Sequence, residues 1–414
     1  MANQILTNQR ITRETNFVLE NNCVAVQRFY RDLDSNFGSK GNKIGDTVYY
    51  RKPPRFTGRT GAAWDPEPLT DTQVPISINQ QFGEDFSMSS IESKLSIDDL
   101  RNRYLAKMAI AIQNRLDVTA LTMAYQNTAN FVGTVGTTPG LSGTDAVLIY
   151  QQAQQKLHEM GANMKTERTI ILTPAMQTGW NVYTKALYNP RGPLGKQLET
   201  GRVMDALGAS WEVDQNAPTH VVGALGGTPA VNGAGQTGSS LICDGTSNSI
   251  TNWANVGDVI TIANVYAVNP QSRVSTGSLQ PFTIQQAASS DGSGNITFTI
   301  SPAIVPSGQF QNVDSIPADN ALISVDGAAA AGQGAIASAS SPQGLLFDRM
   351  AYAFVAMAAD VPDGTNMAYV ERESDVPLRF VQDFNTQTDQ WMGRFDCYIG
   401  CGPLFPEVGL RIFG

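Results

Sequence analysis

The chain has 414 residues, with 28 Lys and Arg against 37 Asp and Glu, which gives a formal net charge of -9. This length is enough for roughly two or three domains with a sizeable buried core. The negative balance argues against a nucleic-acid-binding protein that works through a broad basic face. No apolar run approaches the roughly 18 residues that a membrane span needs, and no signal peptide opens the chain, so we expect a soluble protein made in the cytosol.

The N-terminal region combines a helix with an extended polar segment. Apolar spacing predicts a helix over 13–33, followed by a strand over 44–50. Residues 51–73 are polar, and basic side chains precede acidic ones, which predicts a long hairpin arm with one basic and one acidic limb. Such an arm buries little within its own chain, so we expect a neighbouring subunit to order it; the alternative is a long surface loop. The candidate interface residues are Arg51, Lys52, Arg55, Arg59, Asp65, Glu67 and Asp71.

Three helices and one strand are predicted in the middle of the chain. Apolar residues recur at three- and four-residue steps from Ile97 to Tyr125, which indicates one long amphipathic helix. A second helix is predicted over 144–160, a strand over 169–172, and a third helix that begins at Pro174 and continues past Trp180.

A sharp change of composition marks residues 221–345. This block contains no Lys, no Glu, one Arg, six Asp and 16 Gly. Short β-type runs alternate in it with turn residues, and Asp291–Gly294 is a hairpin signal. We therefore expect a separately folded insert, either a small barrel or a sandwich, and a flexible return linker over 327–341. The predicted strands of the insert are 239–243, 258–265, 281–285, 295–300 and 321–325.

The C-terminal region is predicted to be rich in strands. An apolar strand is expected over 346–357. Three further β-type runs follow, over 376–382, 391–399 and 408–413.

The sequence contains few of the motifs that are typical of catalytic, phosphate-binding or metal-binding sites. His158, late in a helix, and His220, in a loop at the edge of the insert, lie in no catalytic motif. A phosphate-binding P-loop is absent, and no set of four zinc ligands includes Cys397 and Cys401. Cys23 and Cys243 are scattered, so all four thiols are expected to be structural. We predict a protein that is not an enzyme, with no catalytic residues, no cofactor and no metal.

The order of these parts resembles that of tailed-bacteriophage major capsid proteins, and in particular the short-tailed-phage coat subfamily. Pro406-Glu407 is similar to the family's Pro-Glu after its last turn, although Phe405 stands where an arginine is common. The other similar segments are Lys43–Val48, Arg51-Lys52-Pro53, Asp98–Arg101, Leu378–Asp383, Thr388–Gln390 and Arg394–Gly400.

The resemblance implies an α+β fold of the HK-ninety-seven type with an inserted all-β domain. The implied parts are an N-arm (1–48), an extended loop (49–80), a peripheral domain with a spine helix (81–135 and 370–414), an axial domain (136–220 and 346–369) and the insert (221–345).

The implied function is self-assembly into hexamers and pentamers of an icosahedral head. That head would enclose double-stranded DNA without sequence-specific binding. The implied partners are other copies of the chain, a scaffolding protein and a portal protein, with a decoration protein as a further candidate and no membrane. The implied location is the virion, after synthesis in the bacterial host cytoplasm.

Two other classes stay open on the sequence alone. One is another phage structural protein, from a tail or a decoration layer. The other is a hydrolase whose β-rich module would bind sugars through Trp253 and Tyr266, although one Trp and one Tyr in a β-domain are more often core residues.

Overall fold

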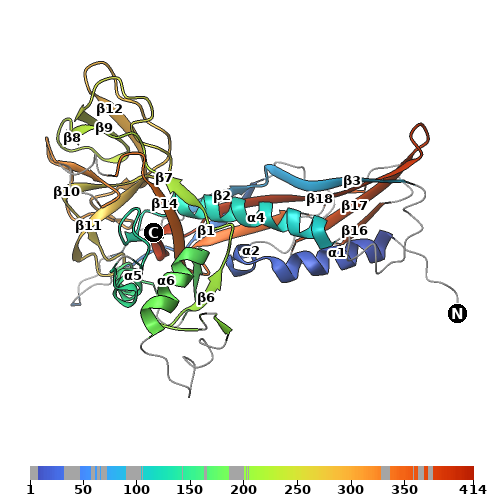
Figure 1. Ribbon diagram of the computed structural model, residues 1–414. Coiled ribbons are helices and arrows are strands. Elements are labelled where there is room, and N and C mark those ends of the chain that lie inside the picture. Colours follow the sequence, from blue (N-terminus) through green and yellow to red (C-terminus); the bar gives the residue numbers. More distant parts are fainter. Residues whose placement is uncertain are drawn as a thin grey trace. The chain divides into compact units, whose positions relative to one another are not determined.

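The computed structural model shows a mixed α and β protein with few helices and many strands (Figure 1). The chain forms two compact units, one from 1–50, 73–120 and 352–402, and the other from 51–72, 121–351 and 403–414. No described helix is both long enough and apolar enough to cross a membrane. The structure describes residues 8–31, 47–56, 61–62, 66, 72–89, 104, 106–141, 143–162, 166–185, 200–201, 203, 205–327, 336–357, 359–361, 368–371 and 376–414.

The first unit is a five-stranded sheet with helices. Its sheet has the order β15-β18-β17-β16, and β3 pairs with β18. Helix α1 packs against β16 and β17 (Figure 1). Strands β1 and β2 pair with each other, and α4 belongs to this unit as far as Ala120. The elements are α1 (Asn8–Asn22), α2 (Ala25–Arg28), β1 (Thr47–Lys52), β2 (Thr72–Ser77), β3 (Gln80–Ser89), α4 (Ala106–Asn127), β15 (Tyr352–Met357), β16 (Ala368–Glu371), β17 (Leu378–Asn385) and β18 (Gln390–Pro403).

Aromatic rings fix the register of this sheet. The rings of Phe380 and Phe395 stack with centroids 4.6 Å apart, and Phe86 of β3 lies 6.1 Å from each of them. Gly393 is the partner of Phe86 across the β3–β18 pair. A Cβ at Gly393 would come within 2.3 Å of the Phe86 ring, so only glycine leaves room for that ring.

Asp117 of helix α4 holds the N-terminal segment in place. Its Oδ1 accepts hydrogen bonds from the backbone N–H groups of Ala25 (3.1 Å) and Val26 (3.3 Å), and its Oδ2 accepts one from Val24 (3.2 Å). The carboxylate is fully buried, and Gln113 donates a further hydrogen bond to it at 2.8 Å. Asp117 therefore caps the first turn of α2 from 93 residues away along the chain.

We expect Asp117→Ala to destabilise the unassembled chain by about 3 kcal/mol, because three backbone donors lose a charged acceptor inside the protein. Urea-induced unfolding measures the change. Thr119→Ala, at a half-buried position of the same helix where the hydroxyl bonds to Arg115 O, is the matched control and should stay within about 0.5 kcal/mol of the unsubstituted protein. Equal stability of the two variants would show that Asp117 does not anchor the segment.

The second unit is built on a sheet of order β4-β19-β14-β5-β6, with β7 paired to β14. The C-terminal strand β19 lies inside this sheet, between β4 and β14. Helix α5 is capped by Asp145, and α6 by Thr173 with Pro174 at its start. The elements are β4 (Phe131–Val132), α5 (Ala146–Glu159), β5 (Arg168–Leu172), α6 (Pro174–Thr184), β6 (Ser210–Val213), β7 (Thr219–Val221), β14 (Ser340–Asp348), the 3-10 turn η5 (Pro406–Val408) and β19 (Gly409–Phe413).

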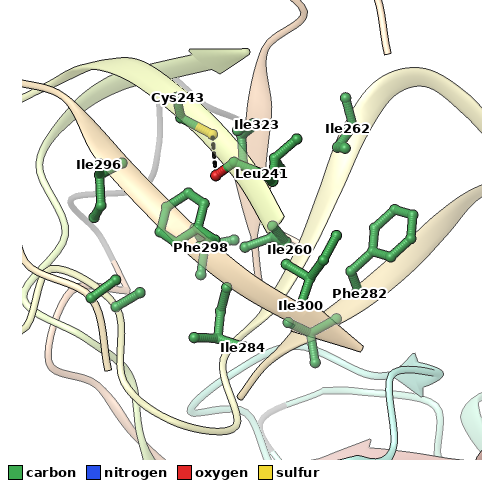
Figure 2. Close-up of a cluster of buried hydrophobic side chains, with 14 of the residues drawn as sticks. Leu241, Cys243, Ile260, Ile262, Phe282, Ile284, Ile296, Phe298, Ile300 and Ile323 are labelled. Carbon is green, nitrogen blue, oxygen red and sulfur yellow. Dashed lines mark hydrogen bonds between the residues drawn. The ribbon is translucent and has the colours of Figure 1, made fainter. Parts of the chain in front are cut away.

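Six antiparallel strands between 227 and 325 form a second sheet in this unit, of order β13-β10-β11-β12-β9-β8. The two edge strands meet, because Val231 N–H donates to Ala321 O and Asn320 N–H donates to Val231 O, both at 2.9 Å. The interior is packed with aliphatic and phenylalanine side chains (Figure 2). The strands are β8 (Gly227–Val231), β9 (Gly238–Thr246), β10 (Val259–Val268), β11 (Ser275–Ile284), β12 (Ile296–Ile304) and β13 (Ile323–Val325).

Several predicted elements differ from the observed ones. The predicted helix over 13–33 is two helices, because the chain breaks before α2. The predicted strand over 346–357 is also two strands, β14 and β15, separated by a turn in which Ala351 N–H donates to Asp348 O at 2.8 Å. Strand β8 was not predicted, since its Gly-Thr-Pro sequence is atypical of strands.

The predicted flexible linker over 327–341 is only partly within the described residues. Its last part is ordered, since Ala337 and Ala339 pack on the core of the six-stranded sheet and Ser338 N–H donates to Gly223 O at 2.9 Å. Residues 328–335 lie outside the described residues, as do 44–46 of the first predicted strand and 97–103 and 105 of the long helix. From Ala106 onward the helix is present and ends at Asn127, close to the predicted end.

Candidate functional site

Two of the predicted interface residues contact the C-terminal segment of their own chain. Arg55 forms an ion pair with Glu407, and its guanidinium lies 5.9 Å from the centre of the Phe310 ring. The Lys52 ammonium lies 5.0 Å from the centre of the Phe405 ring, and burial lowers its pKa although Glu407 opposes this shift. Arg51, by contrast, is exposed.

The other four predicted interface residues, Arg59, Asp65, Glu67 and Asp71, lie outside the described residues. The pairing of β1 with β2 brings together the two ends of the segment that contains them. Among the described basic residues of this segment, Arg51 is the exposed one.

A buried polar cluster lies where the two sheets of the second unit meet. His220 was predicted to lie in a loop, but it belongs to strand β7, whose pairing with β14 turns the imidazole inward to 3% exposure. Its Nε2 lies 2.6 Å from Oδ1 of Asp258, directly before β10. The other oxygen of Asp258 accepts hydrogen bonds from Gly223 N–H (3.1 Å) and Asn255 N–H (2.7 Å).

Asp326, directly after β13, is the second carboxylate of the cluster. Its Oδ1 accepts a hydrogen bond from Val259 N–H at 2.9 Å. Its Oδ2 is buried and has no hydrogen-bond partner among the residues that the structure describes. Burial, followed by the charge of Asp258, raises the pKa of Asp326 to about 8, whereas Arg411 acts in the opposite direction.

Arg411 of strand β19 supplies the permanent positive charge. It is fully buried, and its guanidinium lies 5.4 Å from the centre of the Tyr125 ring and 5.1 Å from that of Phe413. Its Nε donates to Oε1 of Gln343 at 2.9 Å, and its Nη1 donates to Gly257 O. Gly257 directly precedes Asp258, so Arg411 connects the last strand to the start of β10.

This cluster does not form a hydrolytic site that solvent can reach. Ser341 is the strand partner of His220, so it, His220 and Asp258 are residue types of a catalytic triad. However, the Ser341 hydroxyl contacts Gln343 and Pro342 O, and all three side chains are 3% exposed or less. A substrate carbonyl therefore has no access to them.

The remaining candidates from the sequence are structural. His158 Nε2 lies 2.8 Å from Nη1 of Arg168, and burial and the Arg168 charge lower its pKa. Burial raises the pKa of Cys397 to about 12 and that of Cys401 to about 11, which leaves both thiols protonated and unreactive at neutral pH. Trp253 is fully buried, and its Nε1 donates to Gly226 O, so it is a core residue and not a sugar platform.

The cluster itself could not be recognised in the sequence, because its members are separated by up to 191 positions, from His220 to Arg411. Asp258 lies at the start of one predicted strand and Asp326 directly after another, each beside a glycine. Nothing in the local sequence indicates that these two carboxylates lie close together in the fold. Among the described residues, His220, Asp258 and Asp326 are a group that could hold a metal ion.

We expect Arg411→Met to destabilise the unassembled chain by about 3–5 kcal/mol, because it leaves the buried carboxylates without their permanent counter-charge. Adding Asp326→Asn should recover part of this loss, since the second change removes one of those carboxylates. Urea-induced unfolding of both variants checks this expectation, with Arg349→Met, an exposed arginine, as the control. An additive or larger loss in the double variant would show that the two charges are not coupled.

Comparison with known proteins gives structural neighbours only. No family model matches the chain, and no curated protein matches its sequence. A structure from Mycobacterium phage Che8 is similar over 94% of this chain and 90% of that one, with 12% identity and a TM-score of 0.47. The capsid of Ralstonia phage GP4 is similar over 94% and 88%, with 10% identity and a TM-score of 0.42. The CUS-3 coat protein I-domain is similar over 24% of this chain and 94% of that one, with 23% identity and a TM-score of 0.18.

Proposed function

We propose that the chain is the major capsid protein of a tailed phage, a subunit that assembles through many weak contacts into a closed icosahedral head. The observation that carries the proposal is the order of parts along the chain. Anchored N-terminal helices come first, and the paired strands β1 and β2 then enclose a polar segment. A 22-residue helix follows, and a six-stranded sheet lies within the block 221–345, which lacks Lys and Glu. This order agrees with the motifs that resemble the short-tailed-phage coat subfamily.

On this proposal the six-stranded sheet is the inserted domain of an HK-ninety-seven-type subunit, and the subunits form hexamers and pentamers. The partners would be a scaffolding protein, a portal protein and, as a further candidate, a decoration protein. A subunit with a net charge of -9 can enclose DNA without binding it tightly. Burial of Trp253 counts against the alternative of a hydrolase with a sugar-binding module.

The arm would supply the contacts between subunits. Exposed ion pairs contribute roughly 0–1 kcal/mol each, and salt screens them, so a single pair is weak but its repetition over a shell is decisive. Lys52 and Arg55 contact their own chain, which leaves Arg51 and the acidic and basic residues of 57–71 as the proposed contacts with a neighbour.

Negative-stain microscopy of the purified protein, expressed with and without the neighbouring genes of its source genome, tests the proposed function. We expect closed, uniform shells when the scaffold is present, and megadalton particles in sedimentation. A monomer or small oligomer in both preparations would contradict the capsid function and reopen the binding-module alternative.

Charge reversal tests the arm separately. We expect Arg51→Glu to remove most of the assembled material while the unfolding transition of the unassembled chain shifts by no more than about 0.5 kcal/mol. Lys185→Glu reverses an exposed basic residue after α6 and is the matched control, for which shells should form as before. Normal shells from Arg51→Glu would exclude a role of that residue in assembly without affecting the capsid assignment.

A further inference from the structure

We propose that His220, Asp258 and Asp326 form a site for one divalent transition-metal ion of the zinc class, which braces the six-stranded sheet against strand β7. The three ligands come from three separate segments: β7, the turn before β10 and the end of β13. One ligand atom from each residue lies within 4.8 Å of the other two. This inference concerns the folded subunit and does not depend on the proposed function.

An unpartnered buried oxygen is the independent observation that indicates a ligand. Asp326 is 4% exposed, and its Oδ2 has no hydrogen-bond partner among the described residues, although Oδ1 is satisfied by Val259 N–H. A buried carboxylate oxygen without a partner is costly, so protein interiors normally supply a donor or a cation. A carboxylate oxygen of Asp258 lies within 4.8 Å of one of Asp326, so the two carboxylates are close.

The donor set selects the class of metal. One imidazole nitrogen and two carboxylate oxygens match Zn²⁺, which takes about four ligands at about 2.0–2.2 Å, or Co²⁺ in the same geometry. Ca²⁺ requires about six to eight oxygens, and Mg²⁺ requires an octahedron of oxygens, so both fit poorly. A water molecule would complete the tetrahedron of a zinc-class ion.

Binding would exchange a proton for the metal. The 2.6 Å separation of His220 Nε2 and Asp258 Oδ1 is that of a hydrogen bond, so one proton lies between these atoms. The metal takes a lone pair from each of the two atoms. The proton leaves Nε2, from a neutral imidazole to Nδ1 of the same ring and from an imidazolium to solvent, and the two atoms move apart by somewhat under about 1 Å. Because the other oxygen of Asp258 is fixed by two backbone N–H groups, the imidazole is the ligand that moves.

Two nitrogens of the Arg411 guanidinium are directed to acceptors outside the proposed site. Its Nε is bonded to Gln343 and its Nη1 to Gly257 O, so these two groups point to acceptors outside the ligand set. Its charge opposes the rise in the pKa of Asp326 that burial and the charge of Asp258 cause. Ligation would leave both carboxylates deprotonated, so two negative charges would face this single guanidinium and the bound cation.

Metal content and stability of the unassembled full chain test the site. After dialysis against zinc and then metal-free buffer, elemental analysis should give about one zinc per chain. The thermal midpoint should rise by at least about 3 °C over the EDTA-treated protein. Co²⁺ as a probe should give the visible absorption of a tetrahedral nitrogen and oxygen site, without the near-ultraviolet band of thiolate ligation.

Variants assign the ion to these residues. Asp326→Asn should lose the bound zinc and the midpoint shift, whereas Asp319→Asn, an exposed aspartate that precedes β13, should retain both. His220→Gln serves as a second variant if Asp326→Asn does not fold, and its expected result is the same. The proposal is overturned by absence of zinc in the unsubstituted chain, by retention of zinc in a folded ligand variant, or by a thiolate band with Co²⁺.

Discussion

The buried charge of Arg411 is the constraint on which the second unit depends. The residue lies in the last strand of the chain, and that strand occupies an internal position between β4 and β14. The Nε of this guanidinium donates to Gln343 of β14, and its Nη1 donates to the backbone before β10. Arg411 therefore connects the sheet that contains β19 with the sheet of 227–325, and the packing of Phe413 in the core of the second sheet reinforces this connection.

The sequence predicted the elements whose signals are local. Five strands of the six-stranded sheet follow from the β-type runs and repeated turns in 221–345, whereas β8 does not, and α5 and α6 follow from Asp145, Thr173 and Pro174. Features that depend on distant partners were not predictable. The break before α2 requires the Asp117 carboxylate, and the inward position of His220 requires the pairing of β7 with β14. The candidate cluster belongs to this second class, since no member indicates the others.

The basic residues of the arm fall into two groups: those that contact their own subunit and those that are proposed to contact a neighbouring one. Lys52 and Arg55 use aromatic rings and Glu407 to fix the start of the polar segment to the C-terminal turn η5. On the proposed function, fixed ends would let each contact of this segment with a neighbour stay weak and reversible while the assembly as a whole is stable. The six-stranded sheet has a different role on this account, that of a brace joined to the rest of its unit through Arg411 and Phe413.

A cryo-electron-microscopy reconstruction of the assembled protein tests this account most directly. The account predicts a closed shell in which Arg51 and residues 57–71 of each subunit lie against a neighbouring subunit, while Arg411 stays buried beneath the six-stranded sheet. A discrete small oligomer in which residues 57–71 fold back on their own subunit would contradict it.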